Sequence, residues 1–414
     1  MTVFHLLAFA DVMQTVWGIL LAILVLLAMI TIHEFGHYLA GKALKFKINE
    51  FSIGFGPALF KKRSKKTGEL FAVRLIPLGG YCAFDGEDGN EEENAENKSL
   101  PLSNSEQPFE ELKVEPIEEQ EKTEKKEPEE IKMPQGKKFN EQAPWKRIIV
   151  LISGALMNFL LALILLIVMT ASYGVPMCIV MPADFKNDGT DEVPYASWET
   201  QTLAPRDIVL ELDGKDVAMI TDFVEILDGK TVGEQLTVLV LRKAEGGEWK
   251  EKEVSVTLVG DGAFKDMADV DAIVNSLGLK AYTTTLKRGF WATLGGAFSY
   301  SGDMATAVIK TLGQLLTGGL SVDAVGGPVS TIAMTAQAAQ SPVDFLYTAS
   351  FIGVNLAVFN LLPIPALDGS KVIFCIIEWI RKKPINRKVE AAIHFAGIVL
   401  IFGFAILVDL LKLF

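Results

Sequence analysis

The sequence predicts an α-helical polytopic membrane protein, with four transmembrane helices, a membrane-associated β-hairpin region and one small extracytoplasmic domain. Half of its 414 residues are hydrophobic, and the mean hydropathy of +0.31 is too high for an ordinary soluble enzyme. Four stretches without Asp, Glu, Lys or Arg lie at residues 12–32, 148–173, 345–367 and 391–408. Each is long enough to cross about 30 Å of hydrocarbon as a helix. Helices satisfy their own backbone polar groups in lipid, so four spans are the simplest interpretation.

Lysine and arginine residues close to these stretches predict the orientation, because cytoplasmic loops carry an excess of both. Basic residues cluster at 42–66, at 146–147 and at 381–388. All three clusters fall on one side of a four-helix topology, which we therefore expect to face the cytoplasm. Both termini and the loop at 174–290 are then extracytoplasmic. The lipid bilayer of the inner (cytoplasmic) membrane is thus the first predicted partner.

Changes in hydropathy, charge and turn residues divide the chain into eight segments. In order, these are a first transmembrane helix (1–45), a β-hairpin region (46–85), an acidic insert (86–137), a second transmembrane helix (138–175), a small domain (176–260), connector helices (261–342), a third transmembrane helix (343–380) and a fourth (381–414). The segments that need further argument are taken in turn below.

The segment after the first helix alternates apolar and polar residues, with glycine where turns are expected. Its two runs, FKINEFSIGFGPALF at 46–60 and ELFAVRLIPLGGYCAF at 69–84, predict short strands paired as hairpins. The segment is also apolar enough to lie against the membrane or dip into it. The residue pattern leaves two alternatives open, a membrane-associated hairpin and an ordinary cytoplasmic one.

The net charge of −12 comes almost entirely from one stretch. Residues 85–130 hold 18 acidic residues against 5 lysines, a local charge of −13, so the rest of the chain is near neutral. This distribution indicates no nucleic-acid partner. The stretch has too few apolar residues to offset the entropy of ordering. We therefore expect 86–137 to be a disordered cytoplasmic insert, either a solvated tether or a regulatory element.

Residues 176–260 have the pattern of a small soluble domain. RDIVLELDGKDV predicts two strands joined by a tight Asp-Gly turn. TDFVEILDG predicts a short helix that ends at glycine, and EQLTVLVLRK and KEVSVTLVG predict two more strands. The Gly- and Ala-rich residues 286–340 are expected to form helices at the outer membrane surface.

The residues with the clearest chemical meaning form the pentapeptide HEFGH at the end of the first apolar stretch. Residues four apart share one face of a helix, so His33 and His37 point in the same direction, as two ligands of a tetrahedral zinc ion require. Glu34 can act as the general base toward water at the metal. Ionisable residues at a membrane helix end are costly and mark functional sites. The alternative is an interfacial helix end whose polar residues face water.

A catalytic zinc ion normally has three protein ligands, so two histidines leave one position to fill. Asp368, in the sequence NLLPIPALDGS, is an acidic residue at the end of an apolar stretch on the predicted cytoplasmic side. Pro363 and Pro365 should break the helix there. Two alternatives remain equal: Asp368 is the third ligand, or Asp-Gly is only the turn after the third helix. The other histidines, His5 and His394, have no partner at ligand spacing and are expected to be structural or interfacial.

Six short motifs together resemble the site-2 protease family of intramembrane zinc metalloproteases, most closely its bacterial RseP-type branch. They occur in the family's order and span most of the chain: HEFGH (33–37), FSIGFG (51–56), IPLGGY (76–81), GALMN (154–158), GGPVS (326–330) and NLLPIPALDG (360–369). Any one of these motifs would be weak evidence, whereas the ordered set is specific.

The resemblance implies that Zn²⁺ is bound by His33, His37 and Asp368. It also implies that Glu34 is the catalytic general base and that Asn360 helps to hold the substrate backbone. The hairpin region would then be membrane-embedded and would pair with an extended substrate strand. The small extracytoplasmic domain looks like a PDZ domain, present once.

Three positions depart from the family's usual residues. Ala155 stands where proline is usual, and Ser370-Lys371 where Gly-His is common. Arg206-Asp207 replaces the Gly-Asp of the PDZ-like signature, which argues against capture of a free C-terminal carboxylate by this domain.

The predicted activity is that of a zinc metalloendopeptidase, which hydrolyses peptide bonds within or beside the transmembrane segment of a single-span membrane protein. The resemblance suggests trimmed anti-sigma factors or remnant signal peptides as substrates, with zinc near the cytoplasmic face and the PDZ-like domain outside. One rival is a non-catalytic membrane scaffold whose PDZ-like domain binds peptides, disfavoured by the intact Glu34. The other is a transporter with a structural metal, disfavoured because the spans show no inverted repeat.

Overall fold

The computed structural model describes the chain in six stretches: residues 2–87, 133–186, 192–244, 246–259, 276–318 and 326–411. The chain divides into two compact units. The first unit contains Met1–Met29, Ala155–Leu362 and Gly397–Phe414, and the second contains Ile30–Gly154 and Pro363–Ala396. The predicted acidic insert at 86–137 lies almost wholly outside the described residues.

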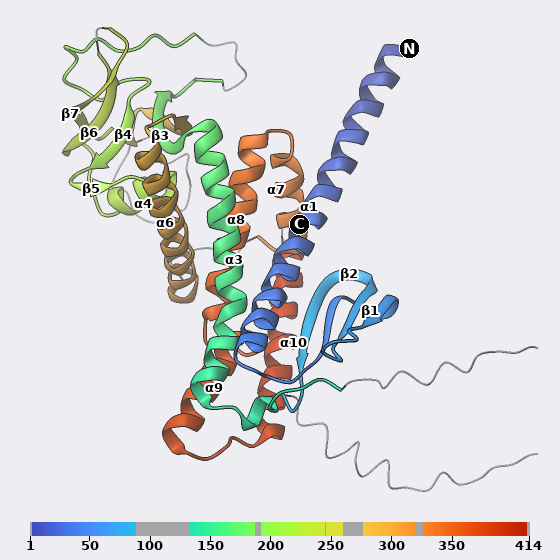
Figure 1. Ribbon diagram of the computed structural model, residues 1–414. Coiled ribbons are helices and arrows are strands. Elements are labelled where there is room, and N and C mark those ends of the chain that lie inside the picture. The colour runs from blue at the N-terminus through green and yellow to red at the C-terminus, as the bar shows by residue number, and fades with distance from the viewer. Residues whose placement is uncertain are drawn as a thin grey trace, which may run out of the picture. The chain divides into compact units, whose positions relative to one another are not determined.

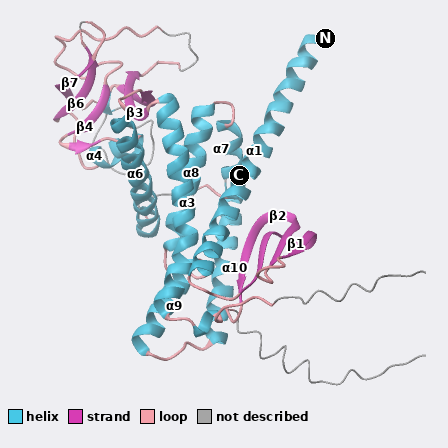
Figure 2. Cartoon of the chain, viewed as in Figure 1, coloured by secondary structure: helices cyan, strands magenta, loops and turns pink. Residues whose placement is uncertain are grey.

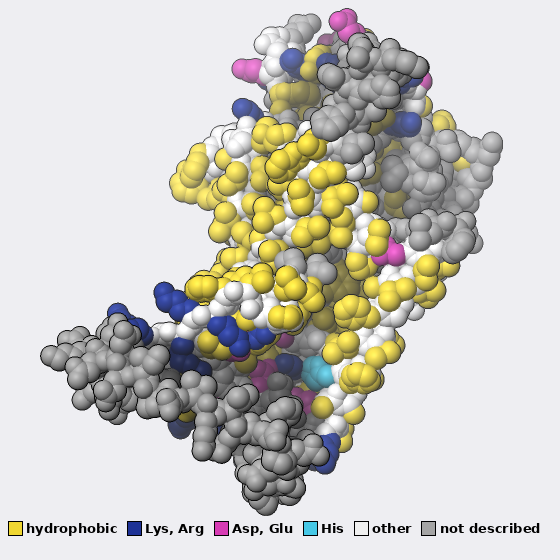
Figure 3. Space-filling model, turned by 90° about the vertical axis from the view of Figure 1, so that its right-hand side faces the viewer, with side chains coloured by type: hydrophobic (Ala, Val, Ile, Leu, Met, Phe, Trp, Pro, Cys, Tyr) yellow, Lys and Arg dark blue, Asp and Glu magenta, His cyan; other side chains and the backbone are white. Residues whose placement is uncertain are grey.

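Among the described residues, four helices are long and apolar enough to cross a membrane, which confirms the predicted number of spans. They are α1 (Thr2–Ala43), α3 (Pro144–Tyr173), α8 (Pro342–Leu361) and α10 (Arg387–Leu411) (Figure 1). In the most apolar windows of α1 and α10, only 17% and 11% of the residues are buried within the protein. Hydrophobic side chains therefore cover much of the exposed surface (Figure 3), as a lipid environment requires.

The predicted third transmembrane segment, 343–380, folds as two helices rather than one. Helix α8 ends at Leu361, and α9 (Asp368–Arg381) begins after a short turn. Pro363 and Pro365 lie between them, and proline cannot continue a helix because it lacks an N–H and its ring clashes with the preceding turn. Asp368 is consequently the first residue of a new helix.

The segment after α1 folds as two antiparallel strands, β1 (Ile48–Arg63) and β2 (Leu70–Phe84), as its alternating pattern predicted (Figure 2). Both strands bend so strongly that Phe51 of β1 pairs with Cys82 on one side and with Phe71 on the other. The hairpin therefore forms a sheet of four short arms. Their order is 80–84, 48–53, 70–76 and 58–63, which leaves the arm at 80–84 at one edge.

An aromatic cluster and an ion pair stabilise the second unit. The rings of Phe46, Phe84 and Phe139, the last in a short 3-10 helix (Phe139–Glu141), lie 5.5–5.6 Å apart by their centroids. A buried Arg147 Nη2 donates to Glu378 Oε2 at 2.6 Å, which ties the start of α3 to α9. The first turns of α9 thus have a fixed place against α3.

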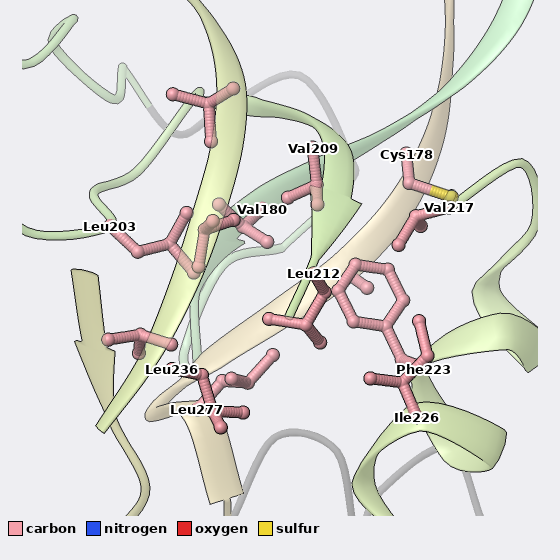
Figure 4. Close-up of a cluster of buried hydrophobic side chains, with 14 of the residues drawn as sticks. Cys178, Val180, Leu203, Val209, Leu212, Val217, Phe223, Ile226, Leu236 and Leu277 are labelled. Atoms are coloured by element: carbon pink, nitrogen blue, oxygen red, sulfur yellow. The ribbon is translucent and has the colours of Figure 1, made fainter. Parts of the chain in front are cut away.

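Within the first unit, the residues from Val175 to Leu286 form a β-rich domain. Its elements are β3 (Val175–Pro182), β4 (Ile208–Leu212), β5 (Lys215–Asp216), α4 (Ile220–Leu227), β6 (Gln235–Lys243), β7 (Trp249–Thr257) and β8 (Leu279–Leu286). The described strands form one sheet in the order β7-β6-β4-β3-β8, with β5 paired to β4. Phe223 of α4 packs among Leu212, Val217 and Cys178 in the core beneath this sheet (Figure 4).

The predicted end of this domain at residue 260 is too early. Strand β8 pairs with β3 along its whole length, from Val175 opposite Leu286 to Pro182 opposite Leu279. The two strands are about a hundred residues apart in sequence, and only the folded sheet brings them together. The strands and the short helix predicted inside the domain are all present.

Two helices follow the domain, as the Gly- and Ala-rich composition predicted: α6 (Phe290–Thr317) and α7 (Pro328–Ala338). Ala297, Tyr300 and Met304 of α6 are buried in a cluster with residues of α3 and α8. The N-terminal end of α6 exposes Phe290 and Trp291, at 71% and 79% of their full surface. A position of α6 at the membrane surface stays a prediction.

Arg206, which stands where the PDZ-like signature has glycine, adopts the left-handed backbone conformation that glycine favours, with φ at 69°. Its guanidinium lies 4.6 Å from the centre of the Tyr195 ring, a cation–π contact that favours this conformation. The adjacent Asp207 is buried and accepts hydrogen bonds from Arg242 Nε at 2.7 Å and Nη2 at 2.5 Å. The domain therefore retains a fixed Asp207 despite the substitution beside it.

We expect Arg242→Ala to destabilise this domain by about 3–5 kcal/mol, because it leaves the Asp207 carboxylate buried without its cation. The matched control is Lys250→Ala, which removes an exposed ion pair with Glu248 at 3.9 Å and should change stability by less than about 0.5 kcal/mol. Hydrogen exchange of the β6 and β7 amides in the full chain, held in detergent, measures both. Equal protection in the two variants would contradict the expectation.

Candidate metal centre

Helix α1 brings the two histidines of HEFGH together, as their spacing predicted. The Nε2 atoms of His33 and His37 lie 3.1 Å apart, and the rings meet nearly edge to face at 87°. Both side chains are buried, with 8% and 7% of their surface exposed. Two imidazole nitrogens at this distance must share either a proton or a metal ion, because two lone pairs cannot be left facing each other in apolar surroundings.

Asp368 completes the cluster from the first turn of α9. Its Oδ2 atom lies 3.0 Å from Nε2 of His33 and 3.2 Å from Nε2 of His37. The carboxylate is largely buried, with 18% of the side chain exposed. The three ligand atoms therefore converge on one point, in a group of residue types that can hold a metal ion.

The geometry and the chemistry of these three residues both fit zinc. Nitrogen and oxygen ligands bind zinc at about 2.0–2.1 Å in a tetrahedral arrangement, which places ligand atoms about 3.3 Å from one another. The separations of 3.0, 3.1 and 3.2 Å are close to this value. Two imidazoles and one carboxylate also leave a fourth position free, which distinguishes catalytic from structural zinc sites.

A backbone carbonyl on α3 orients His37. The Nδ1 atom of His37 donates to the carbonyl oxygen of Val150 at 2.8 Å. The hydrogen bond assigns the proton to Nδ1, so the lone pair of Nε2 faces the cluster. Metal-binding histidines in proteins are usually fixed in this way through their second nitrogen.

Gly154 allows α3 to approach the two histidines. A Cβ atom added at this position would lie 2.5 Å from Nε2 of His37 and 2.8 Å from Cε1 of His33. Neither distance is sterically allowed, so only glycine fits beside the cluster. The sequence motif GALMN pointed to this segment, but no residue in it was assigned a role at the metal.

The edge arm of the β-hairpin lies against Glu34. A Cβ atom on Gly80 would lie 3.4 Å from Cγ of Glu34 and 2.9 Å from the carbonyl oxygen of Ser52. The backbone N–H of Cys82 forms a hydrogen bond with the Glu34 carboxylate. Glu34 is only partly buried, and it shares a turn of α1 with His33 and His37. The carboxylate therefore lies close to both the candidate ligands and the edge arm at 80–84.

Asn360 lies in the last turn of α8 and is partly buried. It belongs to the first unit, whereas the three candidate ligands and Glu34 belong to the second. Its predicted contact with the substrate backbone stays a prediction. His394, which had no assigned partner in the sequence, accepts a hydrogen bond from the turn before Asp368.

Four apolar helices, together with a His-His-Asp group beside a glutamate, define the class of membrane-bound metallopeptidases. The chain belongs to peptidase family M50, the family of the site-2 proteases, whose model matches residues 21–404. The match confirms the family resemblance drawn from the six motifs, and the protein is a zinc metalloprotease.

The chain is similar over nearly its whole length to bacterial zinc metalloproteases. It is 27% identical over 420 residues to the zinc metalloprotease RasP of Bacillus licheniformis, covering 91% of this chain and 94% of that protein. It is 28% identical over 413 residues to the regulator of sigma-W protease RasP of Bacillus subtilis, covering 89% and 92%. A putative zinc metalloprotease of Fusobacterium nucleatum is 28% identical over 405 residues, covering 95% and 99%.

We expect Gly154→Ala to weaken zinc binding by about 10- to 100-fold, the range seen when groups around metal ligands are disturbed. Gly403→Ala on α10 is the matched control, because a Cβ there would meet nothing within 4 Å. Alanine favours a helix over glycine by about 1 kcal/mol at both positions, so reduced helix formation cannot explain a difference. Competition with a chelator of known affinity measures zinc binding. Equal affinities in both variants would show that α3 does not constrain the histidines.

Proposed function

We propose that the protein hydrolyses peptide bonds within or beside the transmembrane segments of single-span membrane proteins, with zinc held by His33, His37 and Asp368. The single observation that carries this proposal is the convergence of the three ligand atoms within 3.2 Å of one another at the end of an apolar helix. Glu34, on the same turn of α1, is the general base.

The chemistry follows from these positions. Zinc, when bound, supplies a Lewis acid that polarises a scissile carbonyl and acidifies water at the site. Glu34 accepts a proton from the attacking water and delivers it to the nitrogen of the leaving amine. Its carboxylate needs a fixed orientation for both transfers, and the N–H of Cys82 provides it. Asp368 and the two histidines stay deprotonated at Oδ2 and Nε2 throughout.

A substrate helix must unwind before cleavage, because its carbonyls are otherwise occupied in its own hydrogen bonds. Among the described residues, the edge arm at 80–84 pairs with a strand on one side only, and it lies directly beside Glu34. Addition of the unwound segment as a further strand at this edge would hold it extended, since main-chain hydrogen bonds recognise any sequence. The family resemblance adds Asn360 to the residues that would hold the substrate backbone.

The substrates we favour are membrane-anchored anti-sigma factors that have already been trimmed outside, or remnants of signal peptides. The name of the similar Bacillus subtilis protein, regulator of sigma-W protease, supports the first class. The basic clusters beside α1, α3 and α10 support an orientation with the metal centre near the cytoplasmic face. The domain that contains β3 to β8 would lie outside, as a single PDZ-like module. A purely scaffolding role is the alternative.

Glu34→Gln should keep the fold and the zinc but lower cleavage of a single-span model substrate by at least about 100-fold, since general-base catalysis typically contributes 10²–10⁴-fold. Asp368→Ala should instead lower both zinc affinity and cleavage. Zinc content and fragment formation, measured on the same purified samples, separate the two roles. Turnover of Glu34→Gln within about tenfold of wild type would contradict the assignment of the base. Full zinc occupancy and activity in Asp368→Ala would contradict that of the third ligand.

The PDZ-like module has two candidate roles, peptide binding and exclusion of substrates with bulky outer domains. We favour exclusion, because Arg206 replaces the glycine of the signature that accompanies carboxylate capture. The test compares cleavage of one transmembrane segment that carries either a short outer tail or a folded outer domain. We expect a strong preference for the short tail in wild type, and a weaker one in Arg242→Ala, which loosens the module. Equal cleavage of both substrates by wild type would refute exclusion. Tight binding of a free C-terminal peptide would favour the peptide-binding role.

A further inference from the structure

The turn before Asp368 has a backbone conformation that its sequence does not favour. The N–H of Leu367 donates to the carbonyl oxygen of Ile364 at 3.1 Å, which closes a four-residue turn. Pro365 occupies the second position of this turn, and Ala366 occupies the third with φ at 83°. These features define a type II turn, in which the third residue is normally glycine because side chains are strained at positive φ.

His394 on α10 makes a polar contact with this strained residue. The N–H of Ala366 takes no part in the hydrogen bond that closes the turn, and it donates instead to Nδ1 of His394 at 3.2 Å. An edge-to-face contact with Phe374 of α9, at 5.9 Å and 72°, fixes the plane of the histidine ring. The ring is therefore held by α9 and bonded to the turn that precedes α9.

The direction of this hydrogen bond fixes the state of the histidine. A backbone N–H can only donate, so Nδ1 must be the acceptor and the neutral ring carries its proton on Nε2. Nε2 is buried and has no hydrogen-bond partner among the described residues. Among the described residues, the hydrogen bond of His394 to the turn is therefore made through Nδ1 and the Ala366 N–H.

The geometry points to His394 as a positioning residue for the third zinc ligand. Only Leu367 separates Ala366 from Asp368, so a change in the turn moves the carboxylate relative to His33 and His37. Leu367 also holds the start of α9, because its carbonyl oxygen accepts from the Oγ of Ser370 at 2.8 Å. We infer that the His394–Ala366 hydrogen bond keeps the strained turn in the one conformation that directs Asp368 Oδ2 to the metal. The inference rests on the proposed role of Asp368.

The test measures zinc affinity of the full chain in detergent by competition with a chelator. His394→Ala should bind zinc about 10- to 100-fold more weakly, the range typical of groups that orient metal ligands. His394→Asn should stay within about threefold of wild type, because its Oδ1 atom can replace Nδ1 as the acceptor. Phe395→Ala, at the neighbouring and largely exposed position of α10, is the matched control and should bind zinc like wild type.

A second variant tests whether His394 acts through the turn. Glycine adopts positive φ without strain, so His394→Ala/Ala366→Gly should bind zinc at least about threefold more tightly than His394→Ala. Two outcomes would overturn the inference: zinc affinity of His394→Ala within threefold of wild type, or no recovery in the double variant. The variant Asp368→Ala distinguishes these two outcomes from a failure of the proposed function. If that variant binds zinc as tightly as wild type, the ligand assignment itself is wrong.

Discussion

The organisation of the second unit follows from one constraint, which is that two imidazole nitrogens and a carboxylate oxygen lie within 3.2 Å of one another in apolar surroundings. Lone pairs that face each other out of water repel strongly, and without a cation the group would separate or take up protons. The surrounding structure must therefore hold the three atoms close enough to favour a divalent metal. Each neighbouring element helps to hold these three atoms together in a different physical way.

Two of the candidate ligands need only local structure, whereas the third needs the whole fold. His33 and His37 are brought together by one turn of α1, and any stable helix would do the same. Asp368 is 335 residues from His33 in sequence, so its position depends on packing. Helix α3 provides that packing, because it contacts both α1 and α9. Gly154 lets it approach the histidines, and Arg147 binds Glu378 of α9 in a buried ion pair.

The difference between local structure and long-range packing explains how much of the site the sequence could predict. The number of spans, the hairpin strands and the approach of His33 to His37 follow from patterns that repeat over a few residues, and the structure contains all three. Asp368 could not be distinguished from a simple turn by pattern alone. Strand β8 was missed because its partner β3 is distant in sequence. Gly154 carries no chemistry that a motif search can recognise, since its contribution is the absence of a side chain.

Backbone strain alone does not locate function in this chain. Arg206 and Ala366 both stand in conformations that favour glycine, with φ at 69° and 83°. The strain at Arg206 is compensated by a cation–π contact. This contact lies on the surface of a domain that is remote in sequence from the candidate ligands. The strain at Ala366, two residues before the candidate ligand Asp368, is compensated by a side chain from another helix. Strain marks a functional site only where relaxation would move a group whose position the chemistry requires. By that criterion the turn before α9 qualifies and the Arg206 turn does not.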